Sequence, residues 1–392
     1  MKYYTVAADF KKETISGYAD LNAKYKDSKV IETYGQATIG SVCEGGRVYA
    51  DIPAISLQDL KEYIEYSNAK GIGFNYSLNG SCMGNKEFTE EGVREIKEFL
   101  HQLYDIGVRG VTVAMPSMIE LIKSTGLDFE IKTSIITKID NVNKALFYKS
   151  LGCERIVVDE SLNRKFSELK RIRDAYGEKV EIIINSLCHK DCPFRMFHYN
   201  QTAHDSVDKM KDSIITFYNH KCMLKRAESV GETFKLCWVR PEDIKLYEEI
   251  GVTYYKVQGR HTAVGGDPVR ALECYFKQSF EGNLIDLLEL FNSPYNFKFN
   301  LDNKKLEGYI KPFNEVENFC KRDCQSCGYC EKFAQKALAY DEAVNINKMA
   351  TDFYNSCDEY TNLLDSINVE DEMEEAQQQT IESDAFDFNL DE

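Results

Sequence analysis

Short apolar runs alternate with amphipathic stretches from the N-terminus to about residue 280. Several runs, such as RIVVD and VEIIIN, are continuously apolar or β-branched, as are strands that a parallel sheet buries on both faces. The stretches between them repeat apolar residues at helical spacing, as in EEGVREIKEFLHQLYDIG and SELKRIRDAYG, and both of these end at Gly, a common helix stop. The predicted strands are Tyr3–Ala8, Val30–Tyr34, Gly73–Ser77, Gly110–Ala114, Phe129–Ile136, Arg155–Asp159, Val180–Asn185, Phe234–Val239 and Tyr254–Gln258.

This alternation predicts an α/β chain built from βαβ units. Eight or nine such units over about 280 residues favour a (β/α) TIM-like barrel over a doubly wound sheet. No G-x-G-x-x-G turn follows the first strand, so the pattern gives little support to dinucleotide binding. Residues 188–233 interrupt the alternation with an irregular insertion that contains Cys and His. In a barrel, chemistry gathers at the C-terminal ends of the strands, where such an insertion would lie.

The pattern changes after Asn283, and we divide the chain into three parts. Residues 1–282 form the barrel-like domain, residues 283–351 a cysteine-rich extension, and residues 352–392 an acidic tail that we expect to be disordered. We expect one helix at Glu331–Met349 and a short one around Leu363–Ile367. A solvated tail is the simplest interpretation, and an arm that binds a partner or inhibits the protein is the alternative.

The acidic charge is concentrated in this tail. Fourteen Asp and Glu residues and no Lys or Arg lie in residues 352–392, so only −2 of the formal charge of −16 belongs to residues 1–351. A nearly neutral body gives nucleic-acid binding no electrostatic support, although a local basic patch can hide within a neutral total. No run of eighteen apolar residues is present, and the N-terminus reaches charged residues too early for a signal peptide. We therefore expect a cytoplasmic protein without a membrane span, in which clustered thiols serve metals.

The first cysteine set combines two predicted strands with the insertion between them. Cys188 and Cys192 follow one strand in NSLCHKDCPFR, Cys222 lies in the insertion, and Cys237 lies in the next predicted strand. Four thiolates that converge at a barrel mouth suit an iron–sulfur cluster or a tetrahedral zinc. The irregular spacing also allows Cys222 and Cys237 to be small buried apolar residues.

The second set is a stronger metal signal. Cys320, Cys324, Cys327 and Cys330 occupy CKRDCQSCGYC, four cysteines in eleven residues. Ligation by thiolates alone selects an Fe–S cluster or zinc, and the spacing resembles a ferredoxin run in reverse order. A further ligand could come from the isolated Cys43, Cys274 or Cys357, although most isolated cysteines are packing residues.

Long segments of the chain resemble the U32 peptidase family. They are GVRGVTVAMPSMIELIKS, EIKTSIITKIDNVNKALFYKSLGCERIVVDESLNRKFSELKRI, VEIIINSLCHKDCP and LCWVRPEDIKLYEEIGVTYYKVQGR. Lys256, Gly259 and Arg260 match the family's Lys-x-x-Gly-Arg motif, and the resemblance covers roughly residues 70–280. It implies a barrel-like fold and a 4Fe–4S cluster on four cysteines, with Cys188 as the first ligand, Cys222 and Cys237 as later ones, and Cys192 as a departure from the usual position. The segment Cys320–Cys330 lies outside the shared block and indicates an added metal site.

The resemblance implies two activities. The family name implies proteolysis, whereas better-understood relatives support oxygen-independent hydroxylation, in ubiquinone synthesis or on RNA. His189 is next to Cys188, but a cysteine bound to iron cannot attack a carbonyl, and neither H-E-x-x-H nor G-x-S-x-G is present. The residues themselves therefore favour the redox activity.

Basic residues near the same strand ends are the catalytic candidates: Arg195, Arg240, Arg260 and His261. The arginines could bind a carboxylate substrate in bidentate fashion, or they could form structural ion pairs. Asp159 and Asn185, at strand ends, are candidate polar wall residues. Three functions stay open: an Fe–S enzyme of hydroxylation type that acts on a small molecule, peptide or RNA; a peptidase or peptide-maturation protein; and a non-catalytic Fe–S or zinc subunit of a complex. A protein partner or electron donor and a carboxylate-bearing small molecule are the expected partners.

Overall fold

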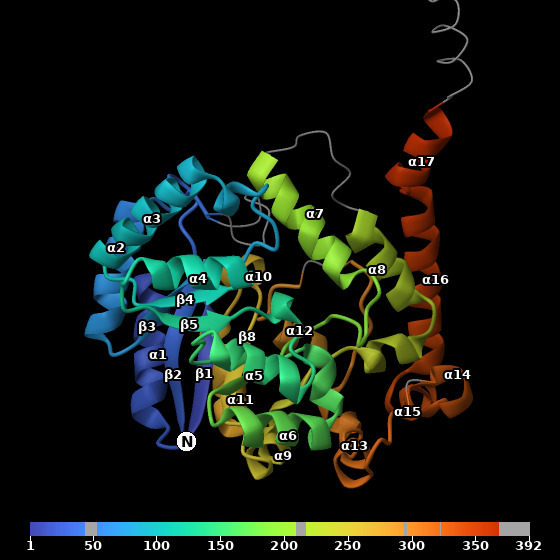
Figure 1. Cartoon of the computed structure of the whole chain (residues 1–392). Helices are drawn as coiled ribbons and strands as arrows, with labels where there is room; N and C mark the ends of the chain where they lie inside the picture. The colour runs from blue at the N-terminus through green and yellow to red at the C-terminus, as the bar shows by residue number, and fades with distance from the viewer. Residues whose placement is uncertain (44–52, 209–216, 294–295, 322, 368–392) are drawn as a thin grey trace, which may run out of the picture.

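Eight strands form one parallel sheet that curves into a barrel (Figure 1). The computed structural model describes all residues except 44–52, 209–216, 294–295, 322 and 368–392. The strand order is β5-β4-β3-β2-β1-β8-β7-β6. A parallel bridge between Lys132 and Arg155 joins the two ends of this order, and the Thr133 N–H donates to the Arg155 carbonyl at 3.0 Å. The strands are β1 (Lys2–Ala7), β2 (Ser28–Gly35), β3 (Gly73–Leu78), β4 (Gly110–Val113), β5 (Glu130–Thr133), β6 (Ile156–Val157), β7 (Val180–Ile183) and β8 (Tyr254–Val257).

Helices surround the sheet, as expected for βαβ units. Those of residues 1–282 outside the insertion are α1 (Lys12–Lys24), α2 (Leu57–Ala69), α3 (Glu90–Asp105), α4 (Pro116–Ser124), α5 (Val142–Ser150), α6 (Phe166–Tyr176), α9 (Ile244–Glu249), α10 (Arg260–Gly265) and α11 (Pro268–Lys277). Short 3₁₀ turns are η2 (Lys86–Phe88), η3 (Ile135–Thr137), η4 (Glu160–Arg164), η5 (Val230–Lys235), η6 (Pro241–Asp243) and η7 (Asn303–Leu306). Helix α6 ends as predicted at Gly177, whose φ of +118° is accessible to glycine at little cost.

The TIM-like barrel prediction is confirmed, and eight of the nine predicted strands exist with small changes at their ends. The strand predicted at Phe234–Val239 is wrong. Strand β7 pairs directly with β8, Glu181 opposite Tyr254, so the sheet has no place for another strand between them. The apolar run instead follows η5, makes a single antiparallel bridge from Leu236 to His189, and buries Trp238 against other elements.

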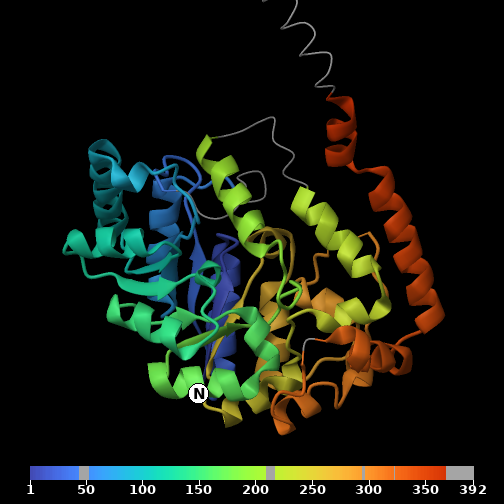
Figure 2. The ribbon, with the colours of Figure 1, turned by 45° about the vertical axis from the view of Figure 1, so that its right-hand side comes forward.

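The insertion after β7 is more ordered than the sequence pattern suggested. It contains helices α7 (Arg195–Asp208) and α8 (Phe217–Ala227), which lie beyond the end of the barrel opposite the N-terminus (Figures 1 and 2). Since β1 starts at Lys2, that end carries the C-terminal ends of the strands. The insertion therefore lies where the sequence predicted it, at the barrel mouth.

The cysteine-rich extension packs against the insertion. It contains α12 (Leu284–Leu288), α13 (Lys311–Glu315), α14 (Cys324–Cys327), α15 (Tyr329–Ala337) and α16 (Tyr340–Ser356). Aromatic rings join the two parts: the Phe234 ring centroid lies 5.3 Å from that of Tyr309 and 5.9 Å from that of Phe333. The Gly231 N–H donates to the Glu331 carboxylate at 2.9 Å, and a Cβ at Gly231 would lie 2.3 Å from that oxygen. Glycine is therefore needed for this close approach.

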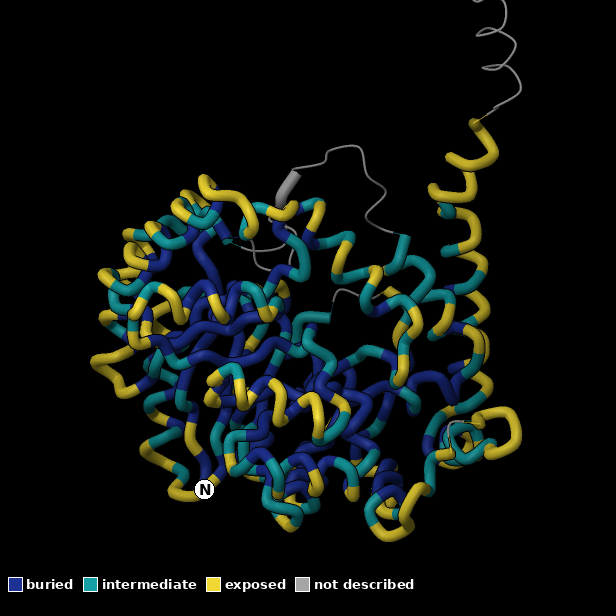
Figure 3. Tube along the Cα trace, viewed as in Figure 1, coloured by how far each residue is buried: buried dark blue, intermediate teal, exposed yellow. Residues whose placement is uncertain are grey.

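The C-terminal helices differ partly from the prediction. The helix expected at Glu331–Met349 is two helices, α15 and α16, because the chain is extended at Leu338. The short helix expected around Leu363–Ile367 starts earlier, as α17 (Glu359–Ser366). Figure 3 shows the barrel interior buried, whereas α16 and α17 expose much of their surface. The disorder predicted for the acidic tail concerns mainly residues 368–392, outside the described residues. No helix of the described residues has the length and apolar character needed to cross a membrane.

Candidate functional site

Three of the four mid-chain cysteines lie close together beside the barrel mouth. Cys188 follows β7 in a turn, and the Cys237 N–H donates to the Cys188 carbonyl at 3.1 Å. Cys222 on α8 is near enough to raise the pKa of the Cys188 thiol through the electrostatic interaction between the two sulfur atoms. Cys192 follows four residues after Cys188, and its carbonyl accepts from the N–H of Arg195 at 3.4 Å. The tertiary structure thus brings sulfur from β7, α8 and the segment after η5 to one region.

Burial and acidic neighbours keep these thiols protonated in the absence of a metal. Burial and then Glu160 raise the pKa of Cys188 to about 12, although Arg195 and Arg226 oppose the shift. The same two causes raise the pKa of Cys237 well above its ordinary value. A free nucleophilic cysteine needs a lowered pKa, whereas a metal ion displaces the proton directly. The raised pKa values therefore make Cys188 and Cys237 unsuited to attack on a peptide carbonyl.

The C-terminal cysteines contact basic residues of the barrel side. The Lys190 ammonium donates to the Cys320 sulfur at 2.5 Å. Burial lowers the pKa of Lys235, but its hydrogen bond to Glu232, followed by Cys324 and Cys330, outweighs burial and raises the pKa above its ordinary value. The Cys330 sulfur lies 3.4 Å from the Tyr309 hydroxyl, while Cys324 and Cys327 are exposed. Burial raises the pKa of the Cys330 thiol, although the positive charges of Arg164 and Lys235 oppose the shift.

One cavity of about 610 Å³ joins the two cysteine sets. Cys192 and Cys222 line it from the insertion, and Cys320, Cys324 and Cys330 line it from the extension. We call this space the cysteine-lined cavity. Five cations and three carboxylates also line it: Arg164, Lys190, Lys221, Lys225 and Lys235, and Asp191, Glu228 and Glu232. The walls therefore combine soft sulfur ligands with an excess of positive charge.

The donor set of the cavity fits a metal centre in its chemistry, since five cysteines line one space. In the part of the chain that the structure describes, no three Cys, His, Asp or Glu side chains are gathered closely enough to hold a metal ion. The thiols instead stand on the walls of a space that is large enough for a small inorganic cluster. Thiolate clusters are anionic, and the surplus of lysine and arginine on these walls matches that charge.

Two of the candidate arginines are held in buried ion pairs. Arg195 lies 3.3 Å from Asp159 and 3.0 Å from Glu160, and it donates to the His189 carbonyl at 2.7 Å. Arg240 forms two hydrogen bonds to Asp243, at 2.9 and 2.8 Å. These contacts favour the structural alternative for both arginines.

The predicted polar wall residues also have protein partners. Asn185 bonds to both the N–H and the C=O of Gln258, each at 2.8 Å, and donates to the Leu288 carbonyl at 2.9 Å. Asp159 accepts the Ser161 N–H at 2.8 Å in addition to its ion pair with Arg195. Both side chains tie strand ends to the segments that follow them.

Arg260 and His261 begin α10, directly beyond β8. The Arg260 guanidinium is buried and donates to the Gln36 amide oxygen at 2.6 Å, whereas His261 is exposed. Lys256, four residues earlier and inside the barrel, has its ammonium 3.9 Å from the centroid of the Tyr34 ring. Burial lowers the pKa of the Lys256 amine, and the charge of Arg260 lowers it further.

The histidines near the cysteines differ in what they can do. Burial, followed by Arg226 and other cations, lowers the pKa of His189 to about 3, so this ring is neutral and a poor proton acceptor at neutral pH. The sequence did not single out His204 together with Cys82. The structure places the Cys82 sulfur 3.5 Å from the His204 Nε2, and the Gly84 N–H donates to the same sulfur at 3.4 Å.

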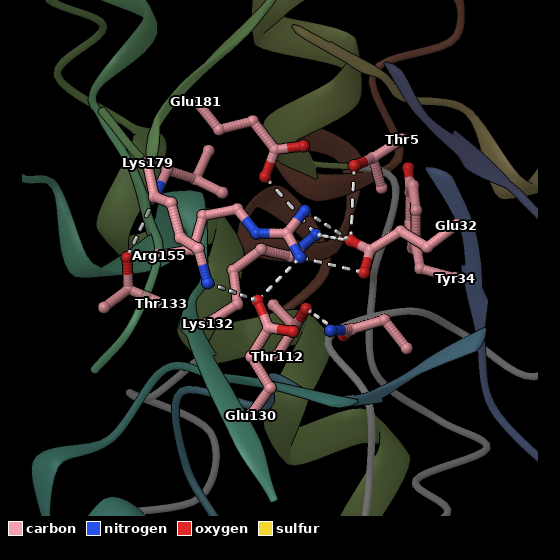
Figure 4. Close-up of polar contacts among 12 residues, drawn as sticks. Thr5, Glu32, Tyr34, Thr112, Glu130, Lys132, Thr133, Arg155, Lys179 and Glu181 are labelled. Carbon is pink, nitrogen blue, oxygen red and sulfur yellow. Dashed lines mark hydrogen bonds and ion pairs between the residues drawn. The ribbon is translucent and has the colours of Figure 1, made fainter. Parts of the chain in front are cut away.

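Sequence reasoning also missed the charged interior of the barrel. Figure 4 shows Glu32, Lys132, Arg155 and Glu181 pointing toward one another from different strands. Lys132 lies 2.6 Å from Glu32 and 3.3 Å from Glu181, and Arg155 lies 3.0 Å from Glu32. A signal was available, because each of the runs IETY, EIKT, VEII and YYKV places a charged residue within an otherwise strand-like segment. In a strand whose other side faces helices, such a residue points into the barrel.

Comparisons with known proteins agree on one family. A model described as peptidase family U32 matches residues 45–265. An uncharacterized protease of Methanocaldococcus jannaschii is 31% identical over 283 residues, which are 72% of this chain and 82% of that protein. The tRNA hydroxylation protein P1 of Bacillus subtilis is 22% identical over 293 residues, 74% of this chain and 57% of that protein. The solved structure of the U32 peptidase Mk0906 has 17% identity and a TM-score of 0.48, covering 66% of this chain and 94% of that one.

Proposed function

The chain belongs to peptidase family U32, and from this premise we propose that it is an iron–sulfur enzyme that modifies its substrate without molecular oxygen, by a hydroxylation-type reaction. The observation that carries the proposal is the cysteine-lined cavity, in which thiols from two distant parts of the chain face a surplus of cations. The similarity to a tRNA hydroxylation protein supports the reaction type. The raised pKa values of Cys188 and Cys237 speak against these two residues as peptidase nucleophiles.

Each cysteine set has its own role in the proposal. Cys188, Cys192, Cys222 and Cys237 hold a 4Fe–4S cluster, and Cys320, Cys324, Cys327 and Cys330 hold a second Fe–S cluster or a zinc ion. Such a cluster supplies one-electron chemistry at the barrel mouth. Arg195 and Arg226 lower the free energy of a Cys188 thiolate, and Lys190 and Lys235 do the same for the C-terminal sulfur atoms.

The cavity also bears on the substrate and the partners. Its lysines suit a carboxylate or phosphate group, which a small molecule, an acidic peptide or an RNA can each supply. A redox reaction of this kind also needs an electron donor, and a protein partner in a cytoplasmic location fits that need. The non-catalytic alternative is a metal-binding subunit of a complex, and it predicts no turnover by the isolated chain.

The proposal is tested on protein purified without oxygen. We expect iron and acid-labile sulfide together with the Mössbauer spectrum of a 4Fe–4S cluster. Cys237→Ala should remove the share of iron held by the mid-chain set, and Cys327→Ala should remove the share held by the C-terminal set. Cys153→Ala, at a buried cysteine away from both sets, is the matched control and should keep the full iron content. Zinc alone, with no sulfide, would sink the proposal.

The peptidase alternative has one specific observation in its favour. Cys82 and His204 form a thiol–imidazole pair at 3.5 Å, and the Gly84 N–H adds a second polar contact to the sulfur. A cysteine beside a histidine is the first requirement of a cysteine peptidase. If this pair hydrolyses peptides, metal-free protein cleaves a peptide library and both Cys82→Ala and His204→Gln abolish the cleavage. Cleavage that persists in Cys82→Ala would reject this assignment.

A further inference from the structure

Inside the barrel, two buried carboxylates are paired with two cations, and a third cationic side chain, Lys256, is not part of these ion pairs. Glu32 and Glu181 are the buried carboxylates, and Lys132 and Arg155 are the cations that pair with them (Figure 4). Arg155 also lies 2.9 Å from Glu130, at the edge of the network. Lys256 is a third interior cation, and within the described residues no carboxylate oxygen lies within 4 Å of its ammonium. The two cations therefore match the two carboxylates in charge without Lys256, while both Glu181 oxygens lack a hydrogen bond in the described residues.

Lys256 lies near the C-terminal ends of the barrel strands, the end at which barrel enzymes have their active sites. It is the third residue of the four-residue strand β8, so its side chain is near the C-terminal rim of the sheet. Its register partners are Thr5 on β1 and Ile183 on β7. Its ammonium stands over the Tyr34 ring, and its side chain keeps 7% of its surface exposed whereas Lys132 keeps none. Lys256 is therefore the more accessible of the two interior lysines.

The electrostatic surroundings make this amine available at neutral pH. Burial lowers the pKa of Lys256 to about 7, and the nearby cations Lys132 and Arg260 lower it as well. Glu181 and Glu32 act in the opposite direction, but their charge is already matched by Lys132 and Arg155. A lysine with a pKa near 7 is largely unprotonated at pH 7.5, and an unprotonated amine is a nucleophile toward carbonyl groups.

We propose that Lys256 is a nucleophilic amine that forms an imine with a small carbonyl compound bearing a carboxylate, which Arg260 attracts. In this step the Lys256 nitrogen attacks the carbonyl carbon, its two protons leave with the carbonyl oxygen as water, and a C=N bond replaces the C=O bond. No electrons are exchanged. Arg260 is buried beside Gln36 and close to Lys256, so its charge selects anionic carbonyl compounds over neutral ones. This inference does not depend on either cysteine set.

The experiment traps the imine by reduction. Full-length protein is incubated with pyruvate and sodium cyanoborohydride at pH 7.5, digested and mapped by mass spectrometry. We expect one reduced pyruvyl adduct, at Lys256, and none at Lys132, which is buried and paired. The yield should rise with pH around a midpoint near 7, well below the pH at which an ordinary lysine amine loses its proton.

Two variants separate chemistry from folding. Lys256→Met keeps a long, uncharged side chain over Tyr34 but cannot form an imine, so it should retain a melting temperature near that of the wild type and lose the adduct. Lys256→Arg adds a permanent charge beside Lys132 and Arg260, so it should lower the melting temperature and also lose the adduct. An adduct that remains in Lys256→Arg, or that is spread evenly over surface lysines, would overturn the proposal.

The preference for a carboxylate is tested by comparing the trapping of pyruvate with that of methyl pyruvate. Methyl pyruvate has the same reactive carbonyl group but no charge, so wild-type protein should trap pyruvate at least tenfold more efficiently than the ester. Arg260→Gln should remove most of this preference, measured within the variant as the ratio of pyruvate yield to methyl pyruvate yield, because loss of Arg260 also changes the pKa of the amine for both compounds. Equal trapping of the two compounds by wild-type protein would overturn the role of Arg260.

Discussion

The barrel interior and the cysteine-lined cavity both contain charged side chains, but they differ in how those charges are satisfied. In the interior, Glu32, Lys132, Arg155 and Glu181 pair with one another at 2.6–3.3 Å. In the cavity, five cations face three carboxylates and five cysteines. Burying a charge without a partner is costly, so a network of matched charges indicates a structural role, and a surplus of one sign indicates a binding role.

The difference also has an origin in chain connectivity. The interior network comes from strands whose register fixes each side chain relative to the others. The cavity forms between an insertion and a C-terminal extension, which meet through aromatic packing and the contact of Gly231 with Glu331. Charges on a rigid scaffold can be paired accurately, whereas a cavity between two appended segments can be shaped around a bound group.

Lys132→Met should give the largest effect, because it breaks the buried network. Two buried carboxylates, Glu32 and Glu181, would lose their shared cation. Removal of one partner of a buried pair costs about 3–5 kcal/mol of unfolding free energy. Urea denaturation measures this loss. The matched control is Lys170→Met, at an exposed pair with Asp174, where the change should be below about 1 kcal/mol. Equal losses of unfolding free energy in the two variants would contradict the distinction between the buried network and an exposed ion pair.

The second-largest effect should come from acid, which should lower the unfolding free energy that the barrel interior contributes. Burial raises the pKa of Glu32, but Arg155 and Lys132 outweigh it and lower the pKa to about 2, below the ordinary value of 4.5. The unfolded chain therefore binds more protons than the folded chain between these values. The stability from Glu32 is fully present above pH 4.5 and is lost as pH falls toward 2, an effect of about 3 kcal/mol. Unfolding of wild type and of Glu32→Gln, measured from pH 6 to 3, should converge as the pH falls.

The smallest effect on stability should come from the cavity in metal-free protein. Cys222→Ser and Cys324→Ser change residues that line the cavity without filling the core, so each should alter the unfolding free energy by less than about 1 kcal/mol. In iron-loaded protein the same variants should lower the melting temperature clearly, because metal binding stabilises only the folded chain. An unchanged melting temperature of loaded protein would show that the cavity contributes no ligands.

Much of the fold followed from local patterns. The strands predicted at Arg155–Asp159 and Val180–Asn185, which form β6 and β7, were recognised as continuous apolar runs of the kind that a parallel sheet buries on both faces, and the barrel followed from the alternation of strands with helices. The run Phe234–Val239 has the same pattern and is not a strand, because its burial comes from packing by Trp238 and its neighbours. Burial alone does not say whether the backbone is paired in a sheet.

The candidate site likewise has features that the sequence identified and features that only the tertiary structure decided. Residue type and spacing in the sequence identified both cysteine sets, since these are local properties, and the resemblance to the U32 family identified the motif that contains Lys256, Gly259 and Arg260. Only the tertiary structure decided that Cys192 and Cys222 share a cavity with Cys320 and that Arg195 and Arg240 are occupied by carboxylates. It also decided that Lys256 remains unpaired among balanced charges. Distances between residues far apart in the chain depend on packing, and packing determines which charges find partners.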